Sequence, residues 1–130
     1  MTMEIIGLGT DITSCARIEH MLEKHPTAFL DHVYTEEEQR YCAQPGSAVE
    51  HYTGRWCAKE AVLKTLGTGW IQGITWRDVE VHNELGGRPT IRLSGGAKKI
   101  ADQLGIDEIL ITISHCKEYA TATAIAIRKR

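Results

Sequence analysis

The sequence predicts an α+β domain with a largely antiparallel sheet. Three observations carry this prediction: strand periodicity near both ends of the chain, a long apolar helix between them, and two pairs of consecutive strands joined by short turns. The 130 residues, of which 42% are hydrophobic and 25% charged, suffice for one domain with a modest core. Because the sequence has no internal repeat, low-complexity segment or long linker, we expect a single domain over residues 1–130.

The N-terminal segment predicts a strand followed by an amphipathic helix. Residues 4–12 have strand periodicity, and their side chains are expected to alternate between Ile6, Leu8, Thr10 and Ile12 on one face and Ile5, Gly7, Gly9 and Asp11 on the other. Thr13 or Ser14 can then cap a helix that ends near Lys24. The buried stripe of this helix is expected to consist of Cys15, Ile18, Met21 and Leu22.

Two capping-box patterns, in which Ser or Thr is followed three residues later by Glu, predict the starts of two further helices. The patterns are Thr35 with Glu38 and Ser47 with Glu50. The first helix is short and ends near residue 42, whereas the second, about residues 48–66, is the longest in the chain. Gly67 follows it, where a C-terminal glycine is typical.

The second half of the chain predicts two strand pairs separated by a helix. The strands are expected at about 78–83, 89–93, 108–115 and 119–128. The intervening helix begins after Ser94 and ends at Gly105. In the last strand every second residue from Ala120 to Ala126 is alanine, so this face is small enough for a helix to pack closely.

Charge and cysteine usage exclude some classes of protein. The 15 Lys and Arg against 17 Asp and Glu give a formal charge of −2, so we expect neither nucleic acid nor a membrane surface as a partner. The longest apolar run is far too short to span a bilayer, and the first apolar residues indicate a strand rather than a leader. The four scattered cysteines form no C-x-x-C pair, which favours reduced thiols in a cytoplasmic protein.

Asp11 is the first candidate functional residue. Gly7 and Gly9 on the same strand face carry no side chain, which would leave room for a ligand beside the carboxylate. Alternatively, Asp11 only ends the strand or caps the next helix. The segment alone leaves both interpretations open.

The long helix supplies the next candidates, because its centre is apolar nearly all round and charges set in it need partners. These charges are Lys59, Glu60 and Lys64. Glu60 and Lys64, one turn apart, could be an ordinary surface pair. They could equally be a carboxylate and an ammonium that bind Mg²⁺ and the phosphate that Mg²⁺ neutralises.

Polar residues elsewhere suggest binding rather than catalysis. Ser114 and His115 end a strand, where an anion contact competes with a simple solvent-exposed strand end. A catalytic pair of His115 with Cys116 is disfavoured, since adjacent strand residues point to opposite faces. Arg17, His20 and Lys24 share one helical face, which is either a solvated surface or a docking strip for an acidic helix.

Taken together, these segments resemble the holo-[acyl-carrier-protein] synthase family of 4′-phosphopantetheinyl transferases. The resemblance covers essentially the whole chain. Its most specific parts are a Lys-Glu-Ala helix that ends in Gly-Thr-Gly and an N-terminal Gly-x-Asp. The matching stretches include residues 7–12, 16–19, 55–61, 64–69, 78–81, 87–89 and 114–115.

The resemblance implies a role for each candidate residue. Asp11 and Glu60 correspond to Mg²⁺ ligands, and Lys64 corresponds to a catalytic lysine that neutralises phosphate. The resemblance also implies that coenzyme A is bound by Lys64, Ser114, His115, Gly67 and Gly69, with Ser114 and His115 acting across a subunit boundary. Arg17 corresponds to a residue that grips the acidic carrier protein, and His20 and Lys24 extend that strip by geometry.

The implied reaction transfers 4′-phosphopantetheine from coenzyme A to a serine of apo acyl carrier protein, in support of fatty acid biosynthesis. The implied assembly is a homotrimer with active sites at subunit interfaces. Whether the proton acceptor is Glu60, directly or through a metal-bound water, or His115 stays open. A non-catalytic module that binds coenzyme A or a carrier protein on the same fold is the alternative function.

Overall fold

The computed structural model describes residues 2–71 and 73–130. Its elements are β1 Met3–Ser14, α1 Cys15–Lys24, α2 Pro26–Val33, α3 Glu36–Cys42, α4 Ala48–Leu66, the 3₁₀ turn η1 Trp76–Asp78, β2 Val79–Asn83, β3 Pro89–Leu93, α5 Gly95–Leu104, β4 Glu108–His115 and β5 Tyr119–Lys129. The predicted elements are all found, and α2 is an additional helix that the sequence analysis missed.

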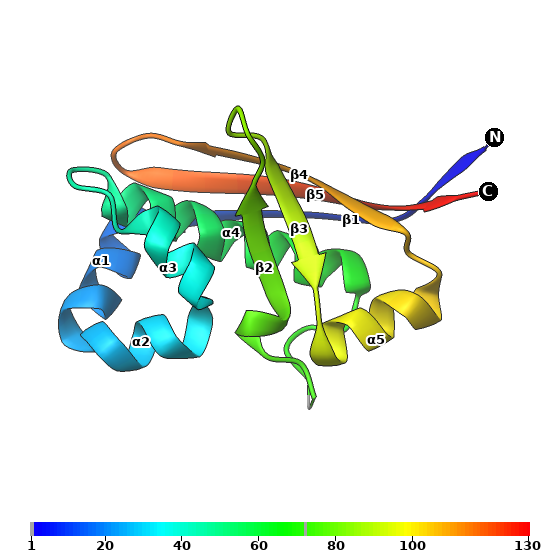
Figure 1. Ribbon diagram of the computed structural model, residues 1–130, viewed down its shortest axis with the longest axis horizontal. Coiled ribbons are helices and arrows are strands. Elements are labelled where there is room, and N and C mark those ends of the chain that lie inside the picture. Colours follow the sequence, from blue (N-terminus) through cyan, green and yellow to red (C-terminus); the bar gives the residue numbers. More distant parts are fainter. Residues whose placement is uncertain (1, 72) are drawn as a thin grey trace.

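The strands form antiparallel ladders, which confirms the predicted fold class. β5 pairs with β1 on one side and with β4 on the other, while β2 and β3 form a separate hairpin. In Figure 1 the long strands run across the top and α4 lies beneath them, with α1 to α3 at one end and α5 towards the other. No helix in the described part of the chain is both long and apolar enough to cross a membrane.

Helix α4 approaches the sheet closely because the facing side chains are small or missing. The predicted alanine face of β5 is buried against it. On β1, a Cβ atom on Gly7 would lie 2.2 Å from the carbonyl oxygen of Thr65, and one on Gly9 would lie 2.0 Å from that of Ala61. The interpretation that these glycines leave room for a ligand is therefore wrong, since the α4 backbone occupies that space.

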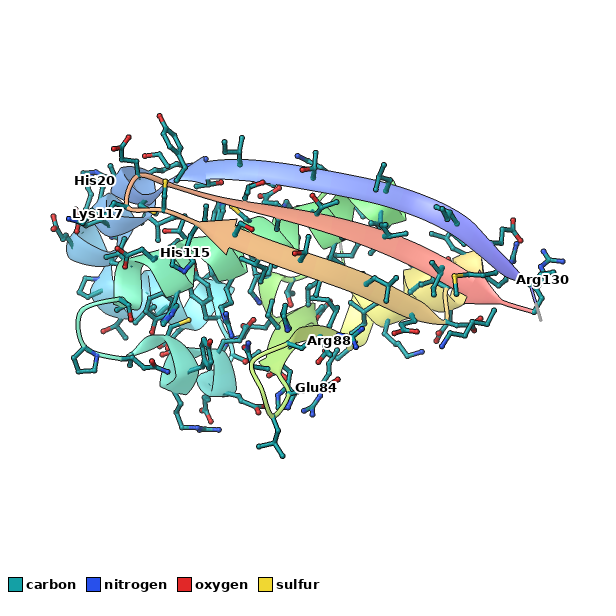
Figure 2. All side chains as sticks on the ribbon, turned by 90° about the horizontal axis from the view of Figure 1, so that it is seen from above. His20, Glu84, Arg88, His115, Lys117 and Arg130 are labelled. Atoms are coloured by element: carbon teal, nitrogen blue, oxygen red, sulfur yellow. The ribbon has the colours of Figure 1, made fainter. Side chains whose placement is uncertain are left out.

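The opposite face of the sheet is open and carries exposed apolar side chains on β1. A β-bulge between Ile5 and Gly7 shifts the register, so Ile5 points outward and Ile6 packs against the core, the reverse of the predicted alternation. The outward side chains that are 62–68% exposed are Met3, Ile5, Leu8 and Ile12. Figure 2 looks onto this face, and the described helices lie behind the strands.

Only one of the two predicted capping boxes forms. The Thr35 hydroxyl accepts the Glu38 amide at 3.2 Å, and the Glu38 carboxylate accepts the Thr35 amide at 2.9 Å. Ser47 begins α4 without a side-chain cap because it closes a backbone turn to Gln44 with ψ of 13° rather than an extended value. The helices after Ser14 and Ser94 likewise begin without a side-chain hydrogen bond from the cap.

A buried ion pair links α3 to α4. The Lys59 ammonium lies 2.8 Å from the Glu38 carboxylate, and both side chains are fully buried. Lys59 also donates to the carbonyl oxygens of Trp76 and Val79, while Glu38 accepts the Val81 amide at 2.8 Å. Burial lowers the pKa of Lys59, and the adjacent Glu38 carboxylate opposes that shift. Each charge thus has the partners that burial requires.

Candidate active site

Strand β1 and helix α4 run antiparallel, side by side. Gly7 lies against Thr65 and Gly9 against Ala61, so a step of two residues along the strand corresponds to a step of four residues back along the helix. These steps have similar lengths, about 6.7 Å along a strand and about 6 Å along a helix. The next strand residue on this face, Asp11, therefore lies level with the helical turn that begins near Cys57.

Asp11 and Lys64 form an ion pair at the edge of α4 that lies along β1. Lys64 Nζ lies 3.4 Å from Asp11 Oδ1 and donates to the Thr10 carbonyl oxygen at 2.7 Å. The other carboxylate oxygen accepts the Thr13 hydroxyl at 2.8 Å. The Lys64 side chain is 51% exposed and that of Asp11 16%. Asp11 therefore neither ends the strand nor caps the helix, and Lys64 pairs with it rather than with Glu60.

Glu60 lies one helical turn before Lys64 and is half-buried. Its Oε1 accepts the indole N–H of Trp70 at 3.4 Å, and no cationic side chain within the described residues pairs with it. Lys64 thus pairs with the Asp11 carboxylate, and the Glu60 carboxylate lies one turn away on the same helix. Carboxylate oxygens are donors that suit a hard cation such as Mg²⁺. The described residues contain no group of three or more His, Cys, Asp or Glu side chains that could hold a metal, so the protein would supply few of the ligands.

The loop after α4 lies next to this edge. Gly67, with φ of 73°, ends the helix in the left-handed conformation, and Gly69 has φ of 67°. A Cβ at either position would meet nothing within 4 Å. These glycines are therefore required by backbone conformation rather than by space.

Ser114 and His115 lie on β4, two strands away from Asp11 on β1. Strand β5 separates β4 from β1, which sets the two strands about 10 Å apart. Ser114 shares its register position with exposed residues of the open sheet face. Within one protomer the structure does not bring these two residues to the Asp11–Lys64 pair.

His115 instead lines a cavity of about 150 Å³ with Arg55, His51, Tyr41 and Asn83. The Arg55 side chain is 4% exposed, lies 3.9 Å from the centroid of the Tyr41 ring and donates to Asn83 Oδ1. Its Nε and His51 Nδ1 are buried and have no hydrogen-bond partner among the described residues. Arg55 and Glu60 are five residues apart, or about 140° around α4, so this cationic recess faces away from Glu60.

The predicted docking strip on α1 is exposed. Arg17, His20 and Lys24 all lie on the surface, and the Arg17 guanidinium lies 5.4 Å from the centroid of the Trp56 ring. Figure 2 shows His20 and His115 at the same end of the molecule. The strip thus reaches α4 through an aromatic contact.

Known proteins are similar to this chain over nearly its whole length. The family model of the 4′-phosphopantetheinyl transferase superfamily matches residues 7–124. This chain belongs to that superfamily. A holo-[acyl-carrier-protein] synthase of Chlamydia pneumoniae is 42% identical over 125 residues, which cover 96% of this chain and 99% of that protein.

Solved structures of other 4′-phosphopantetheinyl transferases share the fold. The acyl carrier protein synthase of Plasmodium yoelii with ADP bound has a TM-score of 0.87 at 32% identity, with 100% of both chains covered. A holo-(acyl-carrier-protein) synthase of Bacillus anthracis in complex with CoA (3′,5′-ADP) has a TM-score of 0.79 at 32% identity, with 98% of this chain and 100% of that one covered. The resemblance predicted from the motifs is thereby confirmed.

The sequence analysis of this 4′-phosphopantetheinyl transferase missed three features around α4. They are the cationic recess of Arg55 and His51, the Lys59–Glu38 pair and the Trp70 contact to Glu60. The need of Lys59 for a partner was predicted, and only the identity of that partner, Glu38, was missed. Arg55 gives the same signal, since it is also a charge in an apolar helix. No local pattern could indicate the Trp70 contact.

The environment of His51 makes stability depend on pH. Burial lowers the pKa of His51 below its usual 6.5, and the nearby Arg55 and His115 add to this shift. The folded state then binds a proton less readily than the unfolded chain, so stability should fall as the pH drops below about 6.5. We expect His51→Gln to lose less stability than the wild type between pH 7.5 and 5.5, measured by thermal unfolding. His20→Gln, on the exposed face of α1, should keep the wild-type dependence, and an equal loss in His51→Gln would contradict the assignment.

Proposed function

We propose that the protein transfers 4′-phosphopantetheine from coenzyme A to a serine of apo acyl carrier protein and releases 3′,5′-ADP. The observation that carries this proposal is the Asp11–Lys64 pair beside Glu60 on one edge of α4. The relatives named as holo-[acyl-carrier-protein] synthases support it, and the Bacillus anthracis complex supports coenzyme A as the co-substrate. We propose that residues 1–130 act as one domain.

The same edge of α4 fits a magnesium ion. Mg²⁺ prefers one or two carboxylates together with phosphate oxygens and water, and Asp11 and Glu60 would provide the carboxylates. Glu60 is free of cationic partners within the described residues, so its charge is available to a cation. When bound, Mg²⁺ would offset charge on the diphosphate of coenzyme A.

Residues of the chain would stabilise charge and accept the proton during phosphoryl transfer. The serine hydroxyl of the carrier forms a bond to the β-phosphorus, and the bond from that phosphorus to the bridging oxygen breaks, so 3′,5′-ADP leaves with the electron pair. Lys64, half-exposed at this edge, binds phosphate oxygens and offsets their developing charge. Glu60 accepts the serine proton, because His115 lies on the opposite side of α4.

We further propose that His115 and Arg55 bind the nucleotide phosphates of coenzyme A held by a neighbouring protomer. Their recess offers a buried guanidinium with a free Nε–H, as an anion site requires. The recess faces away from Glu60 of its own protomer. One coenzyme A molecule would therefore contact the recess of one protomer and Glu60 of another at the interface between them. Gly67 and Gly69 would admit the coenzyme beside Lys64, and Ser114 would contact it from the open sheet face.

The open sheet face supports this assembly. Four large apolar side chains are more than half exposed on one strand, and such a concentration of exposed apolar side chains is typical of an interface between proteins. The family resemblance implies a homotrimer, which is part of the proposal. Covering this face with other protomers would bury these side chains.

The exposed face of α1 fits the carrier. Arg17, His20 and Lys24 would bind the acidic surface of acyl carrier protein. Serving a carrier of fatty acid biosynthesis in the cytoplasm is part of the proposal. The alternative, a non-catalytic module that binds coenzyme A or the carrier, has no observation in its favour. All three residues of the reactive edge, which are Asp11, Glu60 and Lys64, are in place.

Intact mass spectrometry tests the reaction. Apo acyl carrier protein incubated with coenzyme A and this protein should gain the mass of phosphopantetheine with Mg²⁺ and not with EDTA. Glu60→Gln should slow the gain about 100-fold or more because it loses the proton acceptor. Glu50→Gln, near the start of the same helix, is the matched control and should react like the wild type. If folded wild-type protein modifies none of several carriers, the binding-module alternative replaces the transferase.

A further inference from the structure

The tryptophans of the chain, three in all, form one stack. The Trp56 and Trp76 rings lie 4.3 Å apart at 25°, and the Trp76 and Trp70 rings lie 4.0 Å apart at 32°. The three rings come from α4, η1 and the loop after α4. At the Trp56 end the stack continues to Phe29, whose ring centroid is 5.9 Å away, and at the Trp70 end it reaches Glu60.

The stack fixes the direction of the Trp70 indole. Trp70 follows Gly67 and Gly69, and a chain with such glycines does not by itself hold a side chain in place. Stacking on Trp76 restricts the plane of the Trp70 ring. Packing against the buried side chains of the core limits how far the ring can move. The indole N–H is thereby directed at Glu60 Oε1, 3.4 Å away.

Glu60 has little else to orient it. In the part of the chain that the structure describes, the Trp70 indole is the only hydrogen-bond donor to this carboxylate. Asp11, in contrast, is held by both Lys64 and the Thr13 hydroxyl. A carboxylate with several free torsions loses entropy when it is fixed in one orientation, and a donor on a rigid support reduces that loss at the moment of binding.

We propose that Trp70 is a positioning residue that holds the Glu60 carboxylate in the orientation needed to bind the divalent cation. The inference rests on the proposed function, in which Glu60 binds Mg²⁺ and accepts the serine proton. Partners that orient a metal ligand in this way typically change metal affinity or activity about 10-fold to 100-fold when they are removed. Trp76 and Trp56 support the indole without touching Glu60 themselves.

The contact itself is tested by NMR of the apoprotein. With three tryptophans, the indole N–H resonances can be assigned from Trp70→Phe, Trp76→Phe and Trp56→Phe. We expect Glu60→Gln to shift the Trp70 resonance and to leave that of Trp56 in place. An unchanged Trp70 resonance would overturn the inference, whether or not the protein transfers phosphopantetheine. Failure of the proposed function, in contrast, would appear as an unmodified carrier while this shift is present.

The positioning role is tested by Mg²⁺ binding without turnover. Calorimetric titration of Mg²⁺ into the protein with coenzyme A, in the absence of carrier, should give an affinity about 10-fold weaker for Trp70→Phe, which keeps the ring but lacks the N–H. In the transfer assay, excess Mg²⁺ should restore most of the rate of Trp70→Phe. Trp76→Phe, which keeps the Trp70 donor and an aromatic ring for it to stack on, is the matched control and should stay within about threefold of the wild type. A wild-type Mg²⁺ affinity in Trp70→Phe, or a rate that excess Mg²⁺ leaves low, would overturn the role.

Discussion

Replacing Lys59 with methionine is expected to lower the free energy of unfolding by about 3–5 kcal/mol, measured by urea denaturation. Methionine has a similar length and fills the site, but the Glu38 carboxylate would stay fully buried without its cation. The carbonyl oxygens of Trp76 and Val79 would lose a donor as well. This is the largest stability effect that we expect from a single polar replacement.

An exposed ion pair provides the matched control. Lys98 pairs with Asp102 one turn away on the surface of α5, and both side chains are more than half exposed. Lys98→Met should therefore cost less than about 1 kcal/mol. A double variant, Lys59→Met with Glu38→Gln, should recover part of the loss because it removes the buried charge. If Lys59→Met costs no more than Lys98→Met, the pair contributes little to stability.

The boundaries of the elements were predictable because they depend on local patterns. The helix predicted at 48–66 is α4, Ala48–Leu66, and the strand predicted at 119–128 is β5, Tyr119–Lys129. Helix α2 was missed although its signals are local too: Pro26 occupies the first turn, and the buried Phe29 and Val33 are spaced four residues apart.

The details of packing were less predictable, since they depend on partners distant in the sequence. The bulge near Ile5 reverses which isoleucine faces the core, and no local pattern indicates it. Gly7 and Gly9 suggested space for a ligand, whereas they bring the α4 backbone close to β1. The carboxylates of Asp11 and Glu60 suggested a cation site from the sequence alone. That Gly7 and Gly9 serve close packing of α4 could be recognised only from the fold.

The candidate site likewise has one part that local patterns predict and one part that they do not. The edge with Asp11, Glu60 and Lys64 could be predicted, because two of its residues lie on one helix and the motifs add the third. The cationic recess combines side chains from α3, α4, the β2–β3 region and β4, so periodicity in any one segment gives no sign of it. This separation of the two parts across α4 leads to the next prediction.

Mixing two impaired variants is expected to restore part of the activity. Glu60→Gln should slow transfer about 100-fold or more, and His115→Ala about 10-fold to 100-fold at a coenzyme A concentration well below its KM. If each active site takes Glu60 from one protomer and His115 from the next, random mixing makes about one site in four intact. After subunit exchange, the mixture should therefore regain about a quarter of the wild-type rate, measured by the gain of mass of the carrier.

A second mixture separates this arrangement from a general effect of mixing. Glu60 and Lys64 lie one turn apart on one helix, so a site always takes both from the same protomer. Glu60→Gln mixed with Lys64→Met should therefore stay inactive, because every site lacks one of the two. Native mass spectrometry would verify that subunits have exchanged in both mixtures. Recovery in the first mixture alone would locate the active site between subunits, since only there can one protomer supply the reactive edge and another the cationic recess. No recovery in either, with exchange verified, would mean that one protomer holds the whole site and that His115 acts on the protein rather than on the coenzyme.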